Sequence, residues 1–353
     1  GVVLLSRNEV DAAVLAFRDA LQDDPRMADA YRGLGDAYFV KGQLPAAKDA
    51  YTEALRLNPK DAETQRQISL ALVRSGSPAE ALKRLRELAA ASPEDGRTRF
   101  FLARTLAETG EAQPAEVEYR EALRLLGRDA EVSFALAELL SAQGRTSEAL
   151  QQYHATLKMD DTYAPAWFRV AQAALGGGDY PRATEAFLRA GKLEPRLLAE
   201  AYLHLGEVYY RRHQPQKELE AYREALKVRA DYGEARAELA FALFRGQQLD
   251  QALQEGRQAV RDAPDFARGH YYLGVILTRR EQADEAMAEL RQAVRLAPEL
   301  AEAHLFLGRL LLRSKKDREG ARIAFEAALR ARPEFPEARE ALQALGAKGS
   351  AAP

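Results

Sequence analysis

The chain has 353 residues, of which 29% are charged, and its formal net charge is only −2 at pH 7. Because acidic and basic side chains nearly balance, no overall field attracts nucleic acid or an anionic membrane. The absence of cysteine excludes disulfides, cysteine-based zinc sites and thiol catalysis. No stretch approaches the roughly 18 consecutive apolar residues of a membrane span, so we expect no direct membrane insertion.

The chain opens with what we interpret as part of a repeat, residues 1–27. Its small, aromatic and proline residues recur 34 positions later: Ala13 as Ala47, Phe17 as Tyr51, Ala20 as Ala54 and Pro25 as Pro59. We therefore predict that 1–27 contains the second helix of a truncated repeat. The chain lacks an initiating Met, and Gly1 aligns with Gly35 inside a predicted helix, so we interpret it as a fragment of a longer protein.

Nine full repeats follow, with one residue inserted near Leu197 and another within 314–318. Their ranges are 28–61, 62–95, 96–129, 130–163, 164–198, 199–232, 233–266, 267–300 and 301–335. The turn glycine of the first five units is absent from the later ones, so we divide the array into 28–198 and 199–335. A capping helix is predicted at 336–345 and a disordered tail at 346–353.

The eighth position of every repeat is small, which lets the two helices of a unit cross closely. It is held by Gly35, Ser69, Ala103, Ala137, Ala171, Gly206, Ala240, Gly274 and Gly308. The facing position on the second helix is alanine except for Glu218, so we expect repeat six to pack less tightly or to present that carboxylate at its edge. Glycines at the turns and prolines at helix ends complete a consistent all-α prediction.

The pattern resembles the tetratricopeptide repeat family over nearly the whole chain. Eight offsets recur together every 34 residues, in the first unit as Tyr31, Leu34, Gly35, Tyr38, Ala47, Tyr51, Ala54 and Pro59. The resemblance implies a right-handed α-solenoid superhelix of helix-turn-helix units. It also implies a concave groove, lined by positions two, five, nine, twelve and thirteen of each unit, that holds an extended or helical segment of another protein.

Position five supplies a candidate apolar stripe for such a partner. Its residues are Phe100, Phe134, Phe168, Leu203, Tyr271 and Leu305. Facing residues on stacked helices lie about 10 Å apart, close enough to accept successive side chains of a bound segment. The alternative is that these side chains are buried between the first helices of adjacent units, as aromatic residues at helical spacing often are.

Position thirteen supplies a ladder of arginines in the second half of the array. Its members are Arg211, Arg245, Arg279 and Arg313. The planar guanidinium binds carboxylates and phosphates in bidentate fashion, so the ladder would suit an acidic partner segment. The alternative is compensation of the helix dipole, because these arginines end helices that Glu200, Glu234 and Glu302 begin.

Catalytic, metal and cofactor sites are not predicted. The five histidines include His270 and His304 at the fourth position, where Tyr31 and Trp167 lie in other units, so we interpret them as packing residues. The glycines at 176–178 follow no predicted strand and lack the lysine of a phosphate-binding loop. Neutral overall charge and the lack of a constant polar pair per unit argue against RNA reading.

The sequence therefore predicts a non-enzymatic protein-interaction scaffold whose partner carries an acidic or amphipathic segment. Its abundant Ala, Leu, Arg and Glu favour a bacterial source, where we expect a role in polarity, motility, secretion or envelope assembly. The alternative is the superhelical arm of a larger enzyme or polysaccharide-export machine. A further alternative is self-association through residues 2–5. The compartment stays open, with the cytoplasm preferred over the periplasm.

Overall fold

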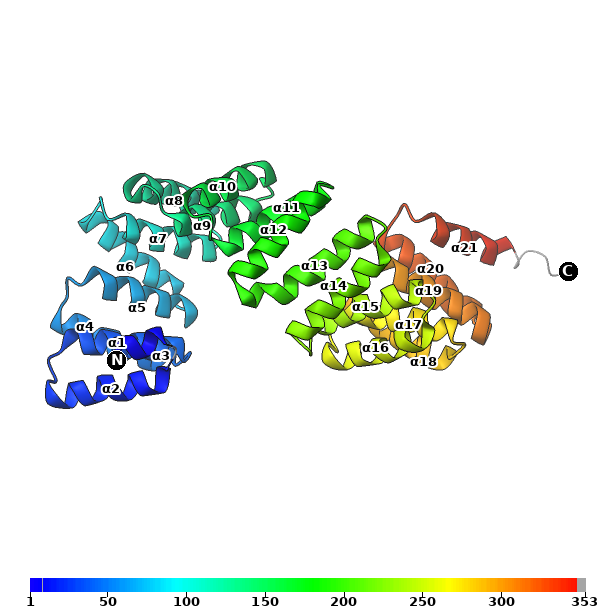
Figure 1. The fold of residues 1–353 in the computed structure, drawn as a ribbon, viewed down its shortest axis with the longest axis horizontal. Helices are drawn as coiled ribbons and strands as arrows, with labels where there is room; N and C mark the ends of the chain where they lie inside the picture. The colour runs from blue at the N-terminus through cyan, green and yellow to red at the C-terminus, as the bar shows by residue number, and fades with distance from the viewer. Residues whose placement is uncertain (8, 348–353) are drawn as a thin grey trace. The chain divides into compact units, whose positions relative to one another are not determined.

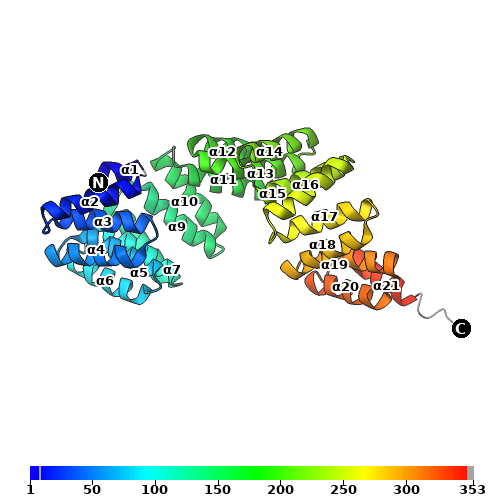
Figure 2. The ribbon, with the colours of Figure 1, turned by 90° about the horizontal axis from the view of Figure 1, so that it is seen from below.

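The computed structural model describes residues 1–7 and 9–347, and all regular secondary structure among them is helical. The chain divides into two compact units, Gly1–Ala166 and Trp167–Pro353, which are described in turn. Each is a row of antiparallel helix pairs stacked side by side (Figures 1 and 2). The fold is therefore an α-solenoid. None of the described helices is long and apolar enough to cross a membrane.

The first unit holds the partial repeat and the first four full repeats. Its helices are α1 (Val2–Ser6), α2 (Val10–Asp23), α3 (Ala28–Val40), α4 (Leu44–Leu57), α5 (Ala62–Arg74), α6 (Pro78–Ala91), α7 (Gly96–Glu108), α8 (Ala112–Leu126), α9 (Ala130–Ala142) and α10 (Thr146–Met159). Val2 and Val3 of α1 are 73% and 62% exposed, whereas Leu4 and Leu5 pack on the core around Ala13. Self-association through this end stays a prediction.

The second unit begins within α11 and ends with the helix expected to cap the array. Its helices are α11 (Ala164–Gly176), α12 (Tyr180–Leu193), α13 (Leu198–Arg211), α14 (Pro215–Val228), α15 (Gly233–Arg245), α16 (Leu249–Asp262), α17 (Ala267–Arg279), α18 (Ala283–Leu296), α19 (Ala301–Leu310), α20 (Arg318–Ala331) and α21 (Pro336–Ala347). Of the predicted tail 346–353, residues 348–353 lie outside the described residues.

Within each repeat, a large side chain of the second helix lies against the small eighth position of the first. A methyl group on Gly35 would lie 2.5 Å from the Tyr51 ring, and one on Gly308 would lie 2.5 Å from the Phe325 ring. Both rings are fully buried. The eighth position is therefore small because the ring of its own repeat occupies the space a side chain would need, and burial of that ring contributes roughly 1.5–3 kcal/mol.

The two inserted residues are absorbed by irregular helical turns. The insertion near Leu197 gives a 3₁₀ turn, Pro195–Leu197, that leads into α13. The insertion within 314–318 gives a π-helical turn, Leu311–Lys315, at the end of α19. It is followed by Lys316 in the left-handed region with φ +51°. The repeat pattern therefore continues on both sides of each insertion.

The turn after the first helix keeps one conformation throughout, although its residue type changes. Repeats one to five place a glycine there, for example Gly110 with φ +83°. Later repeats place His213, Gln247, Glu281 and Lys316 there, with φ between +51° and +61°. L-residues adopt this region at a cost of about 1–3 kcal/mol, so the second unit carries backbone strain that the first avoids.

This difference predicts opposite stability effects for matched substitutions. Gly110→Ala should lower the free energy of unfolding by about 1 kcal/mol, because a side chain there meets no neighbour and only the backbone is strained. Gln247→Gly should raise it by roughly 0.5 kcal/mol, since relief of strain exceeds the added unfolded-state entropy. Urea unfolding measures both, and equal signs would contradict the explanation.

Candidate functional site

Three adjacent hollows in the second unit follow its first helices from α13 to α21, and together they are called the groove. The first hollow, of about 530 Å³, is lined mainly by α13, α15 and α17. The middle hollow, of about 300 Å³, is lined mainly by α15 and α17. The last hollow, of about 560 Å³, is lined by α19, the π-helical turn, α20 and α21. Phe241 lines the first two and Arg313 the last two, so the hollows form one row.

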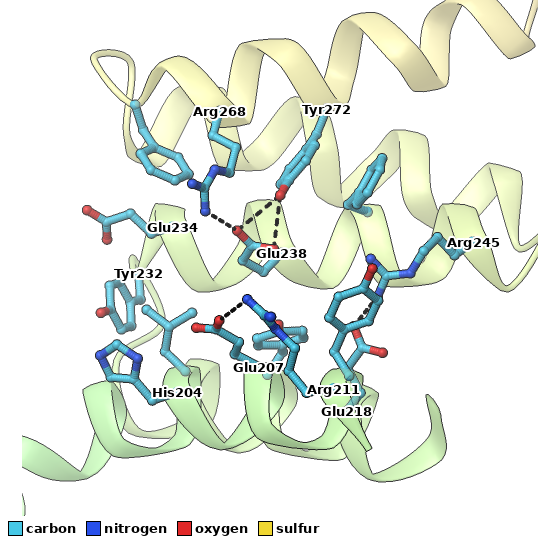
Figure 3. A pocket seen from close by; sticks show the side chains of 15 residues that line it. His204, Glu207, Arg211, Glu218, Tyr232, Glu234, Glu238, Arg245, Arg268 and Tyr272 are labelled. Carbon is cyan, nitrogen blue, oxygen red and sulfur yellow. Dashed lines mark hydrogen bonds and ion pairs between the residues drawn. The ribbon is translucent and has the colours of Figure 1, made fainter. Parts of the chain in front are cut away.

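The first hollow is lined by four glutamates and three arginines, most of them paired (Figure 3). Arg211 lies 3.3 Å from Glu207, and Arg245 pairs with Glu218. Arg268 lies 3.4 Å from Glu238. The Glu234 side chain, by contrast, makes no ion pair or hydrogen bond with the described residues. The hollow thus offers a free carboxylate beside guanidinium groups that already have partners.

Glu238 is a partly buried carboxylate of the first hollow. The Tyr272 hydroxyl donates to both of its oxygens, at 3.2 and 3.3 Å, from the helix opposite (Figure 3). Burial raises the pKa of Glu238, and the nearby Arg268 guanidinium only partly offsets this. Burial likewise raises the pKa of Glu218, against the effect of Arg245. Burial therefore makes the ionised form of both carboxyl groups less favourable than it is in water.

Glu218 replaces the facing alanine in repeat six, where we expected looser packing or a carboxylate at the edge of the repeat. It is 4% exposed and takes the place of an alanine, so its carboxylate is buried rather than presented to solvent at the edge. Arg245, from the next repeat, supplies its partner. The Arg245 guanidinium also lies over the Tyr210 ring, 4.4 Å from its centroid. One member of the arginine ladder is therefore engaged in joining repeats six and seven.

Tyr222 differs from its counterparts in repeats one and four. In repeat one the Tyr51 hydroxyl donates to Asp36 at 2.8 Å, and in repeat four the Tyr153 hydroxyl donates to Glu138. The matching acid in repeat six, Glu207, pairs with Arg211 instead. Tyr222 is 3% exposed, lines the first hollow and has no hydrogen-bond partner among the described side chains. Its hydroxyl is available to a bound molecule.

The raised pKa of Glu238 predicts a pH-dependent stability. Its folded pKa lies above the unfolded value of about 4.5, so the folded state binds the proton more tightly. The resulting stabilisation is fully present below that value and is lost as pH rises through the folded pKa. Glu238→Gln should therefore flatten the fall in unfolding free energy as the pH rises above about 4.5.

Urea unfolding at several pH values measures this effect, because subtraction of the variant curve isolates one group. Glu299→Gln is the control, since Glu299 is an exposed residue outside the hollows. A Glu238→Gln curve that runs parallel to the unsubstituted protein would show that the carboxylate titrates alike in both states.

The residues of the predicted apolar stripe differ in their exposure and do not all line the same hollow. Phe100, Phe168 and Leu305 are 3%, 5% and 3% exposed, so they are buried. The Phe168 ring, for example, lies 5.3 Å from the Phe187 ring. Phe134, Leu203 and Tyr271 are partly buried. Leu203 and Tyr271 line the groove, whereas Phe100 and Phe134 line a separate hollow in the first unit.

The arginine ladder is brought together along the groove. Arg211 and Arg245 line the first hollow, Arg279 the middle one, and Arg313 both the middle and the last. Arg211 and Arg245 already have carboxylate partners, whereas Arg279 and Arg313 make no ion pair or hydrogen bond within the described part of the chain. Recognition of a partner by these residues stays a prediction, and so does dipole compensation.

Several other residues that line the groove were not predicted from the sequence to be site residues. Glu234 and Arg268 occupy position two and Arg309 occupies position nine, so the positions implied by the family resemblance could have found them. Glu238 and Tyr272 both occupy position six and meet across neighbouring helices. No periodic signal marks Lys316, because it lies beside an insertion.

The histidines engage groups of the chain itself. His270 lies 2.6 Å from Glu289 and 3.0 Å from the Pro264 carbonyl oxygen, and His304 lies 3.0 Å from the Pro298 carbonyl oxygen. His204 stacks on Phe187, and burial lowers its pKa. Across the described residues, no group of three or more His, Asp or Glu side chains is placed to hold a metal ion.

Comparisons with known proteins return repeat families and helical repeat structures. A tetratricopeptide repeat model matches residues 134–195, 203–266, 238–301 and 279–334. A model described as the cytochrome c-type biogenesis protein H TPR domain matches residues 3–133. No curated protein matches the chain.

Several solved structures share the fold. Yeast Tom70 aligns with a TM-score of 0.54 at 16% identity, over 98% of this chain and 93% of its own. A chain of the APC/C hetero-tetramer Cut9–Hcn1 aligns with a TM-score of 0.58 at 15% identity, over 97% and 81%. PilF of Pseudomonas aeruginosa aligns with a TM-score of 0.53 at 20% identity, over 61% and 97%. At these identities the likeness concerns the fold alone.

Proposed function

Because the chain belongs to the tetratricopeptide repeat family, we propose that it is a scaffold whose second unit holds a segment of a partner protein in the groove. Repeats of this family form protein-interaction scaffolds and are typically non-enzymatic. The proposal adds the place and the form of binding: an extended or helical segment laid along the first helices of successive repeats.

The observation that carries this proposal is the continuity of the three hollows. Side chains at positions two, nine, twelve and thirteen line them in successive repeats, as Arg268, Val275, Thr278 and Arg279 do in repeat eight. A row of hollows with one repeating set of positions suits a chain molecule with its own repeating side chains better than a compact small molecule. It therefore supports a peptide segment as the occupant.

The chemistry of the first hollow fits a peptide. The Glu234 carboxylate can accept a hydrogen bond from a main-chain N–H, and the Tyr222 hydroxyl can donate one to a main-chain carbonyl oxygen. The Tyr210 side chain, 46% exposed, offers apolar contact. The exposed Arg211–Glu207 pair contributes little to stability, about 0–1 kcal/mol, so it can exchange its partner for a group of the bound segment. The hollow would therefore bind a mixed polar and apolar stretch.

A substitution that fills the middle of the groove tests the proposal. Thr278 is partly buried, lines the middle hollow and lies between the first and last hollows along the row. Thr278→Arg should weaken binding of twelve-residue peptides, selected on the full chain from a random display library, by about tenfold or more. The reason is that a long side chain there blocks an extended segment.

Ala288→Arg is the matched control, because Ala288 is exposed on α18 of the same repeat and gains the same charge outside the hollows. Fluorescence anisotropy gives the affinities, and thermal unfolding shows whether each variant folds. Equal binding by both variants, or a library that yields no peptide, would contradict the groove as the binding site.

A role in the assembly of c-type cytochromes is a second, more specific candidate. It is supported by the match of residues 3–133, most of the first unit, to the repeat domain of a cytochrome c-type biogenesis protein. Deletion of the gene in the source organism should then abolish c-type cytochromes, measured by haem staining of separated proteins. Unchanged haem staining would favour the roles in bacterial polarity, motility, secretion or envelope assembly.

The arm of a larger enzyme or polysaccharide-export machine is the remaining alternative. The sequence of the complete gene distinguishes it, because a catalytic or β-barrel segment beyond either end would favour the arm. The partner in every case is another protein or another part of the same assembly.

A further inference from the structure

We propose that the last hollow is an anion site that takes a partner segment in which an apolar side chain is flanked by carboxylates. This inference rests on the proposed function, since it assigns a chemistry to one end of the groove. Its basis is the coincidence of four features at one place: a cationic rim, an apolar floor, unpaired charges and an inserted π-helical turn.

The rim of the last hollow is formed by cations. Arg309, Arg313, Lys316 and Arg318 line it, and no carboxylate does so among the residues that the structure describes. The first hollow, by contrast, has one more carboxylate than it has guanidinium groups. The groove therefore changes from mixed charge at one end to positive charge at the other, although the whole chain is nearly neutral.

The cations of this rim are largely without partners. Arg318 donates to the Leu345 carbonyl oxygen at 2.5 Å, which leaves its charge uncompensated. The side chains of Arg309, Arg313 and Lys316 make no ion pair or hydrogen bond with the rest of the described chain. The nearest acid in sequence, Asp317, caps α20 by accepting from the Gly320 amide at 2.8 Å. Like charges gathered without a counterion repel one another, so a bound carboxylate would relieve this repulsion.

The floor of the last hollow is apolar. It is formed by Leu312, Phe325, Ala341, Ala344 and Leu345. Phe325 is the buried ring that packs against the eighth position of repeat nine, and the other residues come from the π-helical turn and α21. A simple inorganic anion would leave this floor uncovered. An apolar side chain between carboxylates would cover it and reach the rim at the same time.

The inserted residue is what brings the rim together. Arg313 lies in the π-helical turn Leu311–Lys315, Lys316 follows with positive φ, and Arg318 begins α20. Such π turns occur frequently at functional sites, and strained backbone there is a cost that the surrounding structure must offset. Lys315, the last residue of the π-helical turn, does not line the last hollow. Its ammonium group lies 2.7 Å from the Asp284 carboxylate.

The groove favours a peptide over other amphipathic anions. Arg313 lines both the middle and the last hollows, so a segment in the groove enters the anion site without interruption. The acidic residues of the segment would lie at the end formed by α19 and α21. A fatty acid would also combine a carboxylate with an apolar chain, and the experiment separates the two.

The test uses the full chain and two fluorescein-labelled peptides, Gly-Glu-Glu-Leu-Phe-Glu-Glu-Gly and the matched Gly-Gln-Gln-Leu-Phe-Gln-Gln-Gly. Fluorescence anisotropy should show at least about tenfold tighter binding of the glutamate peptide at low salt. The advantage should shrink as ionic strength rises from about 0.05 M to about 0.5 M. The double variant Arg309→Gln, Arg313→Gln should bind both peptides equally.

Two matched variants show whether the rim itself is responsible. Lys316→Gln should weaken binding of the glutamate peptide several-fold, whereas Lys315→Gln, the same change one residue earlier and outside the hollow, should leave it unaltered. Equal effects of the two, equal affinity for the two peptides, or no binding of either would overturn the anion site. If dodecanoate displaces the labelled glutamate peptide, while excess unlabelled peptide does not compete with it and Thr278→Arg does not weaken it, the hollow is assigned to a fatty acid and the proposal is also overturned.

Failure of the anion site and failure of the proposed function give different results. If library-selected peptides bind the groove and respond to Thr278→Arg, but carry no acidic residues and ignore the rim variants, the anion site is wrong and the scaffold stands. If no selected peptide responds to Thr278→Arg, the groove itself is wrong as the binding place.

Discussion

The packing of one large side chain against one small position is the constraint on which the other features depend. Tyr51 against Gly35 and Phe325 against Gly308 bring the two helices of their repeats close enough to bury both rings. Each unit leaves an apolar face that the next unit covers, so the helices stack in one direction. First helices then lie beside first helices, and this arrangement forms the groove.

Stacking also decides which charges meet. Glu238 and Tyr272 are a full repeat apart in sequence, yet they share hydrogen bonds because both occupy position six of neighbouring first helices. Glu218 replaces an alanine and is tolerated because Arg245 of the next repeat pairs with it. This departure from the repeat pattern is thus matched by a compensating residue in the adjacent unit.

A residue's position in the repeat predicts whether it lines the groove, but it does not predict how deeply the side chain is buried. The ladder Arg211, Arg245, Arg279 and Arg313 lines the groove, as its register implies. Phe100 and Phe168 share the register of Tyr271 and Leu203, yet they are buried whereas the latter are partly exposed. Periodicity gives the direction of a side chain from its helix, and the neighbouring helix decides how much of that side chain remains accessible.

The sequence by itself determined the all-α repeat fold, because the small eighth position recurs in every unit and aromatic and proline residues recur at local spacing in most units. It also determined the positions of the two insertions. Only the tertiary structure decided that one insertion becomes a 3₁₀ turn and the other a π-helical turn, and that the latter gathers Arg309, Arg313, Lys316 and Arg318 over an apolar floor. The physical reason is that an inserted residue is accommodated by the helices packed around it, and those contacts join residues far apart in the chain.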